Sequence, residues 1–430
     1  MFNSEHAQKK WAALLDHPDC TPIQDNYRRA VTATLLENQE KAMKEERLQQ
    51  SFLHEANDTV TGDIGKFDPT LIALVRRAMP SLIAYDVCGV QPMSGPTGLI
   101  FSMIPVYKSD RSGADSGDAA LYNSPDTGFG GIDTNSNDGN AGRGYSAAEA
   151  EALSGDSDAS SPDAGFGAMG FKIDKSTVTA RTRALKAGYS MELAQDLKAI
   201  HGLDAESELA NILSTEILGE INREVILSIR DQAVTSTLGS TAGDFDFTNA
   251  DADLNGARWG QEKFQALVFR IEQEANQIGI DTRRGKGNFV IVSPNVGSAL
   301  AASGSLNYSD AITSTGLSVD TVGNTFAGTL NGSLKVYVDP YRTSDQVVVG
   351  YRGTSAFDAG LFYCPYVPLT MVKAVGEEDF QPRIAFKTRY GIASNPLCTS
   401  TGASLGANFT GELASAGTNV YFRKFSVTAL

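Results

Sequence analysis

Histidine is scarce in this sequence, which has only four among its 430 residues. His6, His17 and His54 lie within the first 55 residues, and His201 stands alone in the remainder, directly before a glycine. Imidazole general-base catalysis and multi-histidine zinc sites need histidines that can meet in the fold. The sequence therefore speaks against both chemistries, and a structural role near a helix end is expected for His201.

The sequence also has few cysteines and no long apolar runs. No CxxC spacing occurs among Cys20, Cys88, Cys364 and Cys398, so each is expected to be reduced and structural. The apolar stretches are far shorter than the roughly 18 residues of a membrane span. The start, Met1–Lys10, is polar and charged and has no secretory character, which predicts synthesis in the cytoplasm.

Positive charge is outweighed by negative charge, and the formal net charge is −15. Residues 110–170 hold eleven acids and two bases and so contribute −9 of this total. Nucleic-acid binding needs clustered Lys and Arg to neutralise phosphates, and an acidic surface disfavours it. If this protein surrounds DNA, it is expected to act as a container and not as a binder.

Segments that suggest a ligand site at first sight fail on their spacing. An EF-hand loop from Asp133 needs Gly at its sixth position and Glu at its twelfth, where this chain has Asp138 and Gly144. The basic segment 283–287 precedes a predicted strand, whereas a phosphate loop follows one, so it is interpreted as a basic turn that contacts an acidic neighbouring subunit. No GxSxG motif occurs. No catalytic, cofactor-binding or metal-binding residue is predicted, and a hydrolase or a calcium-dependent surface protein stays a remote alternative.

Residues 1–55 predict a detachable helical leader. Ser4 can cap a short helix that Pro18 ends, and residues 25–52 predict a longer, highly charged helix with a thin apolar stripe. Such a helix cannot build a core alone and needs partner helices. A solvated N-terminal extension and an internal scaffold that holds subunits together transiently are equally compatible with this pattern. Residues 56–70 predict a mobile arm.

The rest of the chain predicts helices mixed with short strands. Residues 82–101 predict strands joined by turns, and residues 109–170 predict a protruding loop in which Phe129 and Phe166 are isolated anchors. A helix over 204–234, capped by Asp204, would span roughly 45 Å. Further helices are expected at 190–200 and 261–278 and from Ser293, and strands within 171–186 and at 289–292, 334–338, 346–350, 362–369, 384–390 and 420–427. Without a regular βαβ repeat, this pattern favours an α+β fold.

Ordered stretches along the chain carry a family resemblance. They are Lys10-Trp11, Leu14-Leu15, Glu37–Lys41, Ser51–Ala56, Arg76–Phe101, Phe171–Ile229, Phe380–Pro382, Phe386–Ile392 and Tyr421–Arg423. Through them the chain resembles the precursor of the major capsid protein of T-even-type tailed bacteriophages. The resemblance is weakest over residues 106–170.

The resemblance implies the Hong-Kong-97-type capsid fold. In that fold an N-terminal arm and an extended β-loop reach over neighbouring subunits, and a spine helix crosses a peripheral domain. The corresponding ranges here follow the leader 1–55: an arm at 56–95, an extended loop at 96–185 with an acidic insertion at about 107–170, a peripheral domain at 186–284 with the spine helix at 204–234, an axial domain at 285–380, and returning strands at 381–430.

The resemblance also implies a structural role and not an enzymatic one. The chain is expected to assemble into hexameric capsomers that tile an icosahedral or prolate shell around double-stranded DNA, with removal of the leader during maturation. The protease of that family favours Leu or Ile two residues before Glu. Of three such triplets in this chain, the one formed by Leu53 and Glu55 lies where helix gives way to coil, so cleavage is predicted between Glu55 and Ala56.

Partners and location follow from the same resemblance. Other copies of the chain, a prohead protease, an internal scaffold, vertex and portal proteins, decoration proteins and a host chaperonin are the expected partners, and no cofactor is expected. The mature protein is expected in the virion shell after assembly in the host cytoplasm. The nearer alternative is the vertex, or pentamer, paralogue of the same fold.

Overall fold

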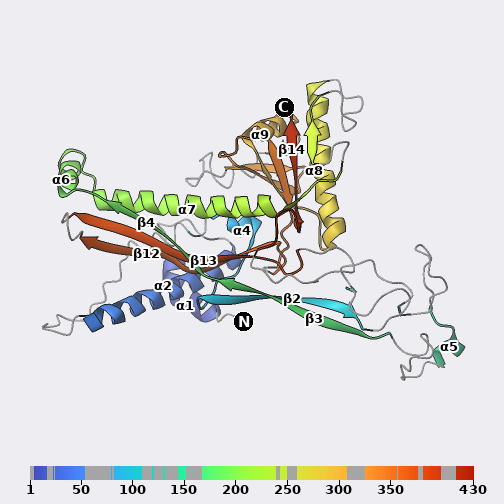
Figure 1. Cartoon of the computed structure of the whole chain (residues 1–430), viewed down its shortest axis with the longest axis horizontal. Coiled ribbons are helices and arrows are strands. Elements are labelled where there is room, and N and C mark those ends of the chain that lie inside the picture. Colours follow the sequence, from blue (N-terminus) through green and yellow to red (C-terminus); the bar gives the residue numbers. More distant parts are fainter. Residues whose placement is uncertain are drawn as a thin grey trace.

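The computed structural model describes residues 4–16, 23, 25–53, 79, 82–108, 119–120, 129–130, 144–151, 167–238, 243–248, 259–307, 325–355, 357–375, 381–398 and 413–430. Two units share one long helix, α7, and a two-stranded hairpin leaves the body at their junction (Figure 1). We call them the elongated unit, which contains a four-stranded sheet, and the compact unit, which contains an eight-stranded sheet.

Helix α7 (Ala205–Gln232) is the spine that both units use. Its apolar residues recur every four positions, at Leu213, Ile217, Ile221, Val225 and Ile229, and all are buried. This spacing places them on one face of the helix, which explains why it packs along its length. Asp204 is the N-cap residue as predicted, but its side chain makes no capping bond; its carbonyl accepts from the Glu208 N–H at 3.2 Å.

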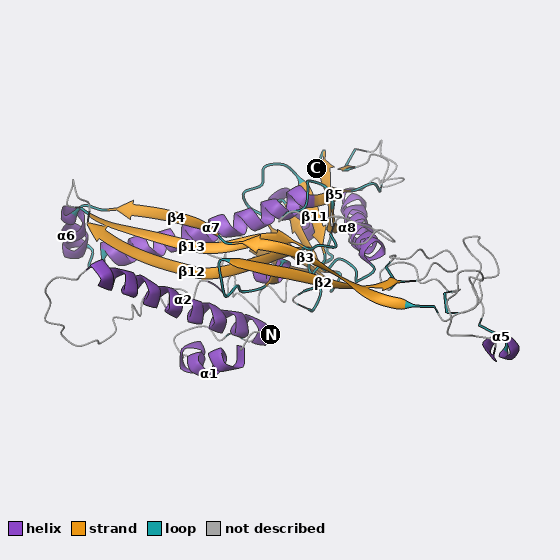
Figure 2. Ribbon diagram, turned by 60° about the horizontal axis from the view of Figure 1, so that its bottom comes forward, coloured by secondary structure: helices purple, strands orange, loops and turns teal. Residues whose placement is uncertain are grey.

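The elongated unit consists of a sheet between helices. Its strand order is β1 (Gly89–Val90), β12 (Leu361–Val375), β13 (Pro382–Ser394) and β4 (Arg181–Gly188), antiparallel except for β1 on β12. Helix α7 lies on one side of this sheet, and α2 (Asn26–Leu53) lies on the other, with α1 (Ser4–Leu15) beside it (Figure 2). The short helix α4 (Ala84–Val87) contacts α7 through the Ile83 N–H, which donates to Asn222 Oδ1 at 3.1 Å.

The compact unit is built on a mixed sheet. The strand order is β5 (Ala233–Thr235), β14 (Asn419–Thr428), β11 (Gln346–Gly350), β7 (Phe289–Val292), β10 (Leu334–Val338), β9 (Thr325–Leu330) and β8 (Leu306–Asn307), with β6 (Asp244–Asp246) also on β14. Helices α8 (Gly260–Thr282) and α9 (Pro294–Ala302) bury their apolar faces against one side of it. Alternate side chains of β7 and β11 face the other side, where they join the cluster around α7.

A buried charge network joins α8 to β14. Glu274 is fully buried and lies between Arg270 and Arg423, both only 4% exposed. The Arg423 Nε donates to Glu274 Oε2 at 2.9 Å, and its Nη1 donates to Asp281 Oδ2 at 2.6 Å. Ser236 donates its hydroxyl to the other oxygen of Glu274. The charges are therefore compensated inside the unit, as burial of charge requires.

The hairpin pairs β2 (Thr97–Tyr107) with β3 (Met169–Thr179) in antiparallel register along its whole length. It reaches away from the body toward the small helix α5 (Ala147–Glu151) (Figure 1). At its base it crosses β13 at Gly391, where a Cβ would lie 2.9 Å from the carbonyl oxygen of Thr179. The absence of a side chain at Gly391 therefore permits this close crossing.

The α+β class predicted from sequence is confirmed, and most predicted helices and strands form near their expected bounds. The strands predicted over 82–101 are a partial exception, because Ala84–Val87 forms the helix α4 that packs against α7. Two predicted strand ranges were too short: β12 and β13 extend well beyond 362–369 and 384–390 because they pair with each other as far as Val375 and Pro382. The other edge of β13 pairs with β4. Helix α8 continues to Thr282 and stops where Arg283 adopts a left-handed conformation, with φ 54°.

Candidate assembly surfaces

One face of the hairpin carries a row of exposed apolar side chains, which we call the hairpin stripe. Its members are Leu99, Phe101 and Met103 on β2 and Met169, Phe171 and Ile173 on β3. Met103 lies directly opposite Ile173 in the register, so the two strands present these residues on the same face. Phe171 is 67% exposed and Leu99 is 61% exposed. Phe357 extends the row, with its ring 6.2 Å from that of Phe101.

The other face of the same hairpin is packed against the protein. Ile100 and Val178 are buried with Met93, Phe362 and Cys364 at the base. Farther out, Ile104 is buried against Ala119 and Leu397. On the face of the stripe, Tyr107 lies opposite Met169 at the distal end and is buried there, with its ring 4.3 Å from that of Phe129. The predicted anchor Phe129 thus holds the distal end of the hairpin, while Phe166 lies outside the described residues.

The contrast between the faces indicates what the hairpin stripe is for. A lone two-stranded hairpin is only marginally stable in water, and exposed contiguous apolar patches mark interaction surfaces. Among the described residues, one face of this long hairpin is packed and most of the other face is exposed. The stripe is therefore a candidate interaction surface.

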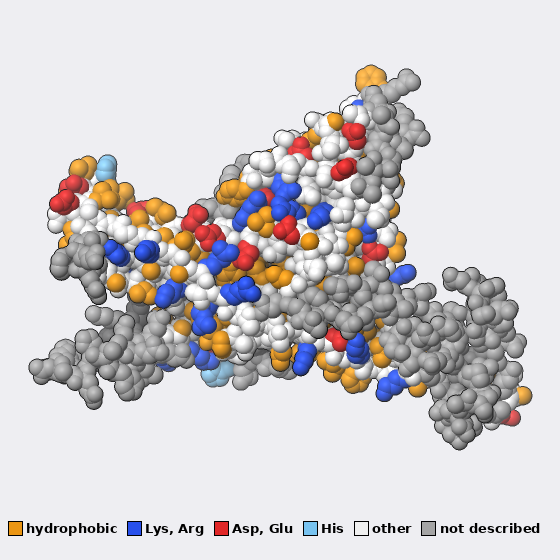
Figure 3. Space-filling model, viewed as in Figure 1, with side chains coloured by type: hydrophobic (Ala, Val, Ile, Leu, Met, Phe, Trp, Pro, Cys, Tyr) orange, Lys and Arg blue, Asp and Glu red, His pale blue; other side chains and the backbone are white. Residues whose placement is uncertain are grey.

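A second exposed apolar surface, the tip patch, lies at the opposite end of the elongated unit. It combines Met191, Leu193 and Ile200 of α6 (Met191–Ile200) with Leu203, Ile212, Val372 and Val375. In the described part of the chain α6 has no buried residue, although Ser190 caps it by accepting from the Leu193 N–H at 3.2 Å. Figure 3 shows apolar and acidic side chains gathered over this end. The hairpin runs from the middle of the molecule toward α5, whereas the tip patch lies at the opposite end (Figure 1).

The leader is docked on the body of the same chain. Val31, Ala33, Leu35 and Leu36 of α2 are buried in the cluster that contains Tyr85 and Leu369. Helix α1 contributes Ala7 and Leu15 to this cluster. Of the two interpretations left open by the sequence, a freely solvated extension is therefore wrong for these helices, because their apolar stripe is covered by the sheet.

Polar contacts fix the position of α2. The Asn38 side chain, 6% exposed, donates to the carbonyls of Met93 at 2.8 Å and Tyr366 at 3.1 Å. Arg28 pairs with Asp86 and lies over the Tyr85 ring. Tyr27 donates its hydroxyl to the Val90 carbonyl, and burial raises the pKa of Tyr27 to about 12, so the donor keeps its proton at neutral pH.

The predicted cleavage residues lie at and beyond the end of α2. Leu53 is the last residue of the helix, and Glu55 and Ala56 lie outside the described residues, as do residues 56–78, 80 and 81 of the arm predicted at 56–95. The competing triplets lie within helices: Glu37 is inside α2 and Glu220 is inside α7, where it pairs with Arg183 at 2.9 Å. Sequence reasoning placed the junction from this helix end but did not foresee the dock.

Other candidate sites of the sequence have structural explanations. Cys88, Cys364 and Cys398 are buried, and burial raises the pKa of each thiol to about 12, which makes them poor nucleophiles. Two of the three bases of the basic turn are paired within the chain, Arg284 with Asp358 at 2.8 Å and Lys286 with Glu272, while Arg283 is exposed. Cys20 and residues 131–139, with Asp133 and Asp138, lie outside the described residues.

Across the described ranges no cluster of His, Cys, Asp or Glu side chains is arranged to hold a metal ion. No helix there combines the length and the apolarity that a membrane crossing requires. The candidate assembly surfaces are therefore the hairpin stripe, the tip patch and the leader dock, by which we mean the surface of the body on which α1 and α2 pack.

Comparisons with known proteins agree on one family. A family model described as "Major capsid protein Gp23" matches residues 64–427. The major capsid proteins of Escherichia phage AR1 and Enterobacteria phage T4 are each 37% identical to this chain, and each alignment covers 98% of both proteins. The capsid vertex protein of phage T4 is 29% identical over 53% of this chain and 53% of its own length. Among solved structures, the capsid of Myoviridae phage XM1 aligns over 88% of this chain and 97% of its own, with a TM-score of 0.40 and 10% identity.

Proposed function

This chain belongs to the Gp23 family of major capsid proteins, and from that premise we propose how its surfaces build and mature a phage head. It is a structural subunit of a tailed-phage head and resides in the virion shell. Its relatives are structural capsid proteins. The vertex alternative has less support, because the vertex protein matches about half of the chain and the major capsid proteins match nearly all of it.

The shell is assembled through heterologous contacts that close into hexamers. The observation that carries this proposal is the hairpin stripe, a long apolar face that the described residues leave exposed. The tip patch lies on the other side of the elongated unit and does not cover the stripe, so neighbouring copies supply the cover. Different patches in contact generate closed rings when the rotation closes, and rings then tile.

The predicted domain ranges describe how the subunit contributes. The range 96–185 contains the hairpin, which serves as the extended loop, and α7 serves as the spine of the peripheral domain. The axial range 285–380 supplies β7 to β11 and α9, while α8 and β14 from the flanking ranges complete their sheet and core. Residues 56–95 serve as the arm, and the insertion at about 107–170 lies in sequence between the two strands of the hairpin.

Maturation removes the leader by cleavage between Glu55 and Ala56. The end of α2 at Leu53 supports this position, because a protease needs extended backbone and the two competing triplets lie in helices. Removal of residues 1–55 takes Val31, Leu35 and Leu36 out of a shared core, so the step changes the packing of the subunit. A protease of the head carries it out, and an internal scaffold, vertex and portal proteins, decoration proteins and a host chaperonin take part in assembly.

Intact-mass measurement of the chain recovered from native particles tests the maturation step. A subunit that starts at Ala56 is expected in mature heads, and Glu55→Ala should leave the precursor uncleaved. A matched Glu37→Ala change within α2 should be cleaved normally. Mature particles built from chains that still start at Met1 would contradict the proposal.

A further inference from the structure

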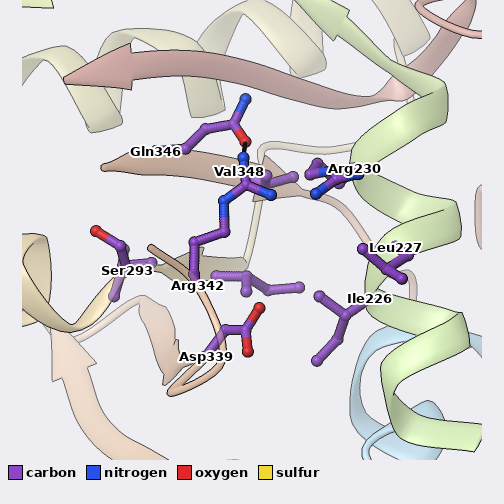
Figure 4. Close-up of a pocket in the computed structure, with 10 residues that line it drawn as sticks. Ile226, Leu227, Arg230, Ser293, Asp339, Arg342, Gln346 and Val348 are labelled. Atoms are coloured by element: carbon purple, nitrogen blue, oxygen red, sulfur yellow. Dashed lines mark hydrogen bonds between the residues drawn. The ribbon is translucent and has the colours of Figure 1, made fainter. Parts of the chain in front are cut away.

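A pocket lies between the C-terminal half of α7 and the compact unit. Its apolar floor comes from Ile226 and Leu227 of α7 and from Ile291 and Val348 of the sheet. Its polar rim comes from Arg230, Ser293, Asp339, Arg342 and Gln346. In Figure 4 Arg342 rises from its turn toward Gln346, and Arg230 enters from α7 on the other side. The pocket therefore offers two guanidinium groups above an apolar surface.

The bases around this pocket outnumber the acids that compensate them. Asp339 is already engaged by Arg223, and Asp231 is engaged by Arg230 at 2.7 Å. Lys424 donates to the Arg230 carbonyl at 2.9 Å and brings a further positive charge. Arg342 donates to Gln346, a neutral acceptor, and its buried Nε has no hydrogen-bond partner among the described residues. Figure 3 shows Lys and Arg side chains gathered over this junction.

The electrostatics of the pocket agree with this geometry. Burial lowers the pKa of Arg342, and the neighbouring charges of Arg230 and Arg223 lower it further against the opposing effect of Asp339. Burial also lowers the pKa of Lys424, with Arg230 and Arg342 adding to the effect and Asp231 opposing it. An incoming negative charge would relieve this repulsion.

The tip of the elongated unit carries the complementary chemistry. On α6, Glu192 and Asp196 are exposed, are one helical turn apart and have no salt bridge in the described part of the chain. Leu193, Leu197 and Ile200 follow at helical spacing beside them, and Leu193 and Ile200 are well exposed. Acidic and apolar groups on one short helix match basic and apolar groups around one pocket.

The two surfaces cannot meet within one chain. They lie at opposite ends of α7, which rises about 1.5 Å per residue over its 28 residues and so separates them by roughly 40 Å. We propose that the pocket lined by Arg230 and Arg342 receives the acidic face of α6 from a second copy of this chain. The contact rests on the proposed shell function and names one of its heterologous interfaces.

DNA is a poorer candidate for the same pocket. Phosphate recognition along a duplex needs an extended basic surface, whereas this cluster is small and has Asp231, Asp339 and Asp345 around it. The net charge of −15 also opposes approach of DNA. A carboxylate on a partner helix is the occupant that the mixed apolar and basic lining favours.

Charge reversal in the full-length chain tests the contact. Particle yield is measured by sedimentation of lysates from cells that express the complete set of head proteins. Arg230→Glu with Arg342→Glu should lower the yield about tenfold or more, and Glu192→Arg with Asp196→Arg should do the same. The chain with all four substitutions should recover most of the loss. Lys335→Glu and Glu216→Arg, at exposed positions outside the pocket lining and outside α6, are the matched controls and should leave the yield unchanged.

Folding and the alternatives are separated by further readouts. Unfolding of the unassembled variants shows whether a loss arises from misfolding; if the reversed pocket does not fold, Arg342→Gln alone takes its place and should still lower the yield. A four-substitution chain no better than either pair, or a pocket variant equal to Lys335→Glu, overturns the contact. Normal shells with reduced DNA content would assign the pocket to DNA and also overturn it. Failure of the unmodified chain to form particles would instead contradict the proposed function.

Discussion

The compact unit and the hairpin use strand alternation in opposite ways. In the compact unit both faces of the sheet are covered by helices of the same chain, and even charged side chains such as Glu274 find partners inside. In the hairpin the described residues bury one face, whereas most of the other face, including Phe101 and Phe171, is exposed. The compact unit therefore completes its core within one chain, whereas the hairpin is suited to contacts with other chains.

Loss of the buried charge network in the compact unit should lower the free energy of unfolding more than any other change considered below. Glu274→Ala leaves Arg270 and Arg423 buried without their shared carboxylate, so we expect a loss of about 3–5 kcal/mol in the free energy of unfolding. Denaturant unfolding of the unassembled chain measures it. Glu216→Ala, at an exposed position, should change stability by no more than about 0.5 kcal/mol. Equal effects of the two substitutions would contradict the buried network.

Two adjacent hairpin residues sharpen the comparison, because Met103 and Ile104 point to opposite faces. Ile104→Ala should cost about 2–4 kcal/mol in stability, since Ile104 is fully buried against Ala119 and Leu397. Met103→Ala should change the stability of the unassembled chain by about 0.5 kcal/mol or less. It should nevertheless lower particle yield, because Met103 belongs to the hairpin stripe. A normal particle yield from the chain with Met103→Ala, Phe101→Ser and Phe171→Ser combined would contradict the role of the hairpin stripe in assembly.

The leader should respond to loss of its central polar contact. Asn38→Ala leaves the Met93 and Tyr366 carbonyls without this donor, and we expect the docking of α2 to weaken by about 1–3 kcal/mol. Hydrogen exchange of α2 amides measures the change, while the amides of the compact unit serve as an internal reference. Lys41→Ala, which removes an exposed pair with Glu37, should have little effect. Uniform acceleration across the whole chain would point to global and not local destabilisation.

The smallest expected effect is a pH dependence within the leader. Burial acts to raise the pKa of the Glu40 carboxyl, but Lys10 and Lys44 outweigh it and hold that pKa below its ordinary value of 4.5. The contribution to stability is therefore complete above that value and is lost as the pH falls through the lowered folded-state pKa. Protection of α1 amides should fall in acid, by well under about 1 kcal/mol. Glu40→Gln should remove this pH response, and an unchanged response would assign it to another group.

The sequence was sufficient for the elements with strong local patterns. The i, i+4 apolar repeat of α7 and the uninterrupted apolar run of β7 predict their structure because each follows from burial of one face or of both. The lengths of β12 and β13 were underestimated, since their outer residues, including Val375 and Pro382, are held by long-range pairing that no local pattern encodes.

The candidate surfaces were harder to predict for a related reason. Alternating residues from Leu99 to Ile104 indicate a strand, but both faces of that strand are apolar, so the sequence does not reveal which face stays uncovered. The leader dock depends on Asn38 meeting carbonyls 55 and 328 positions away in the sequence. The cleavage residues Leu53, Glu55 and Ala56 stay a prediction, supported by the helix end that precedes them.

Image reconstruction of particles assembled from this chain tests the central claim most directly, because it shows what covers the hairpin stripe. We predict that Leu99, Phe101, Met103 and Phe171 are buried against a neighbouring copy of the chain. A reconstruction in which these side chains face solvent, or fold back onto their own subunit, would contradict the claim that the uncovered face of the hairpin is an assembly surface.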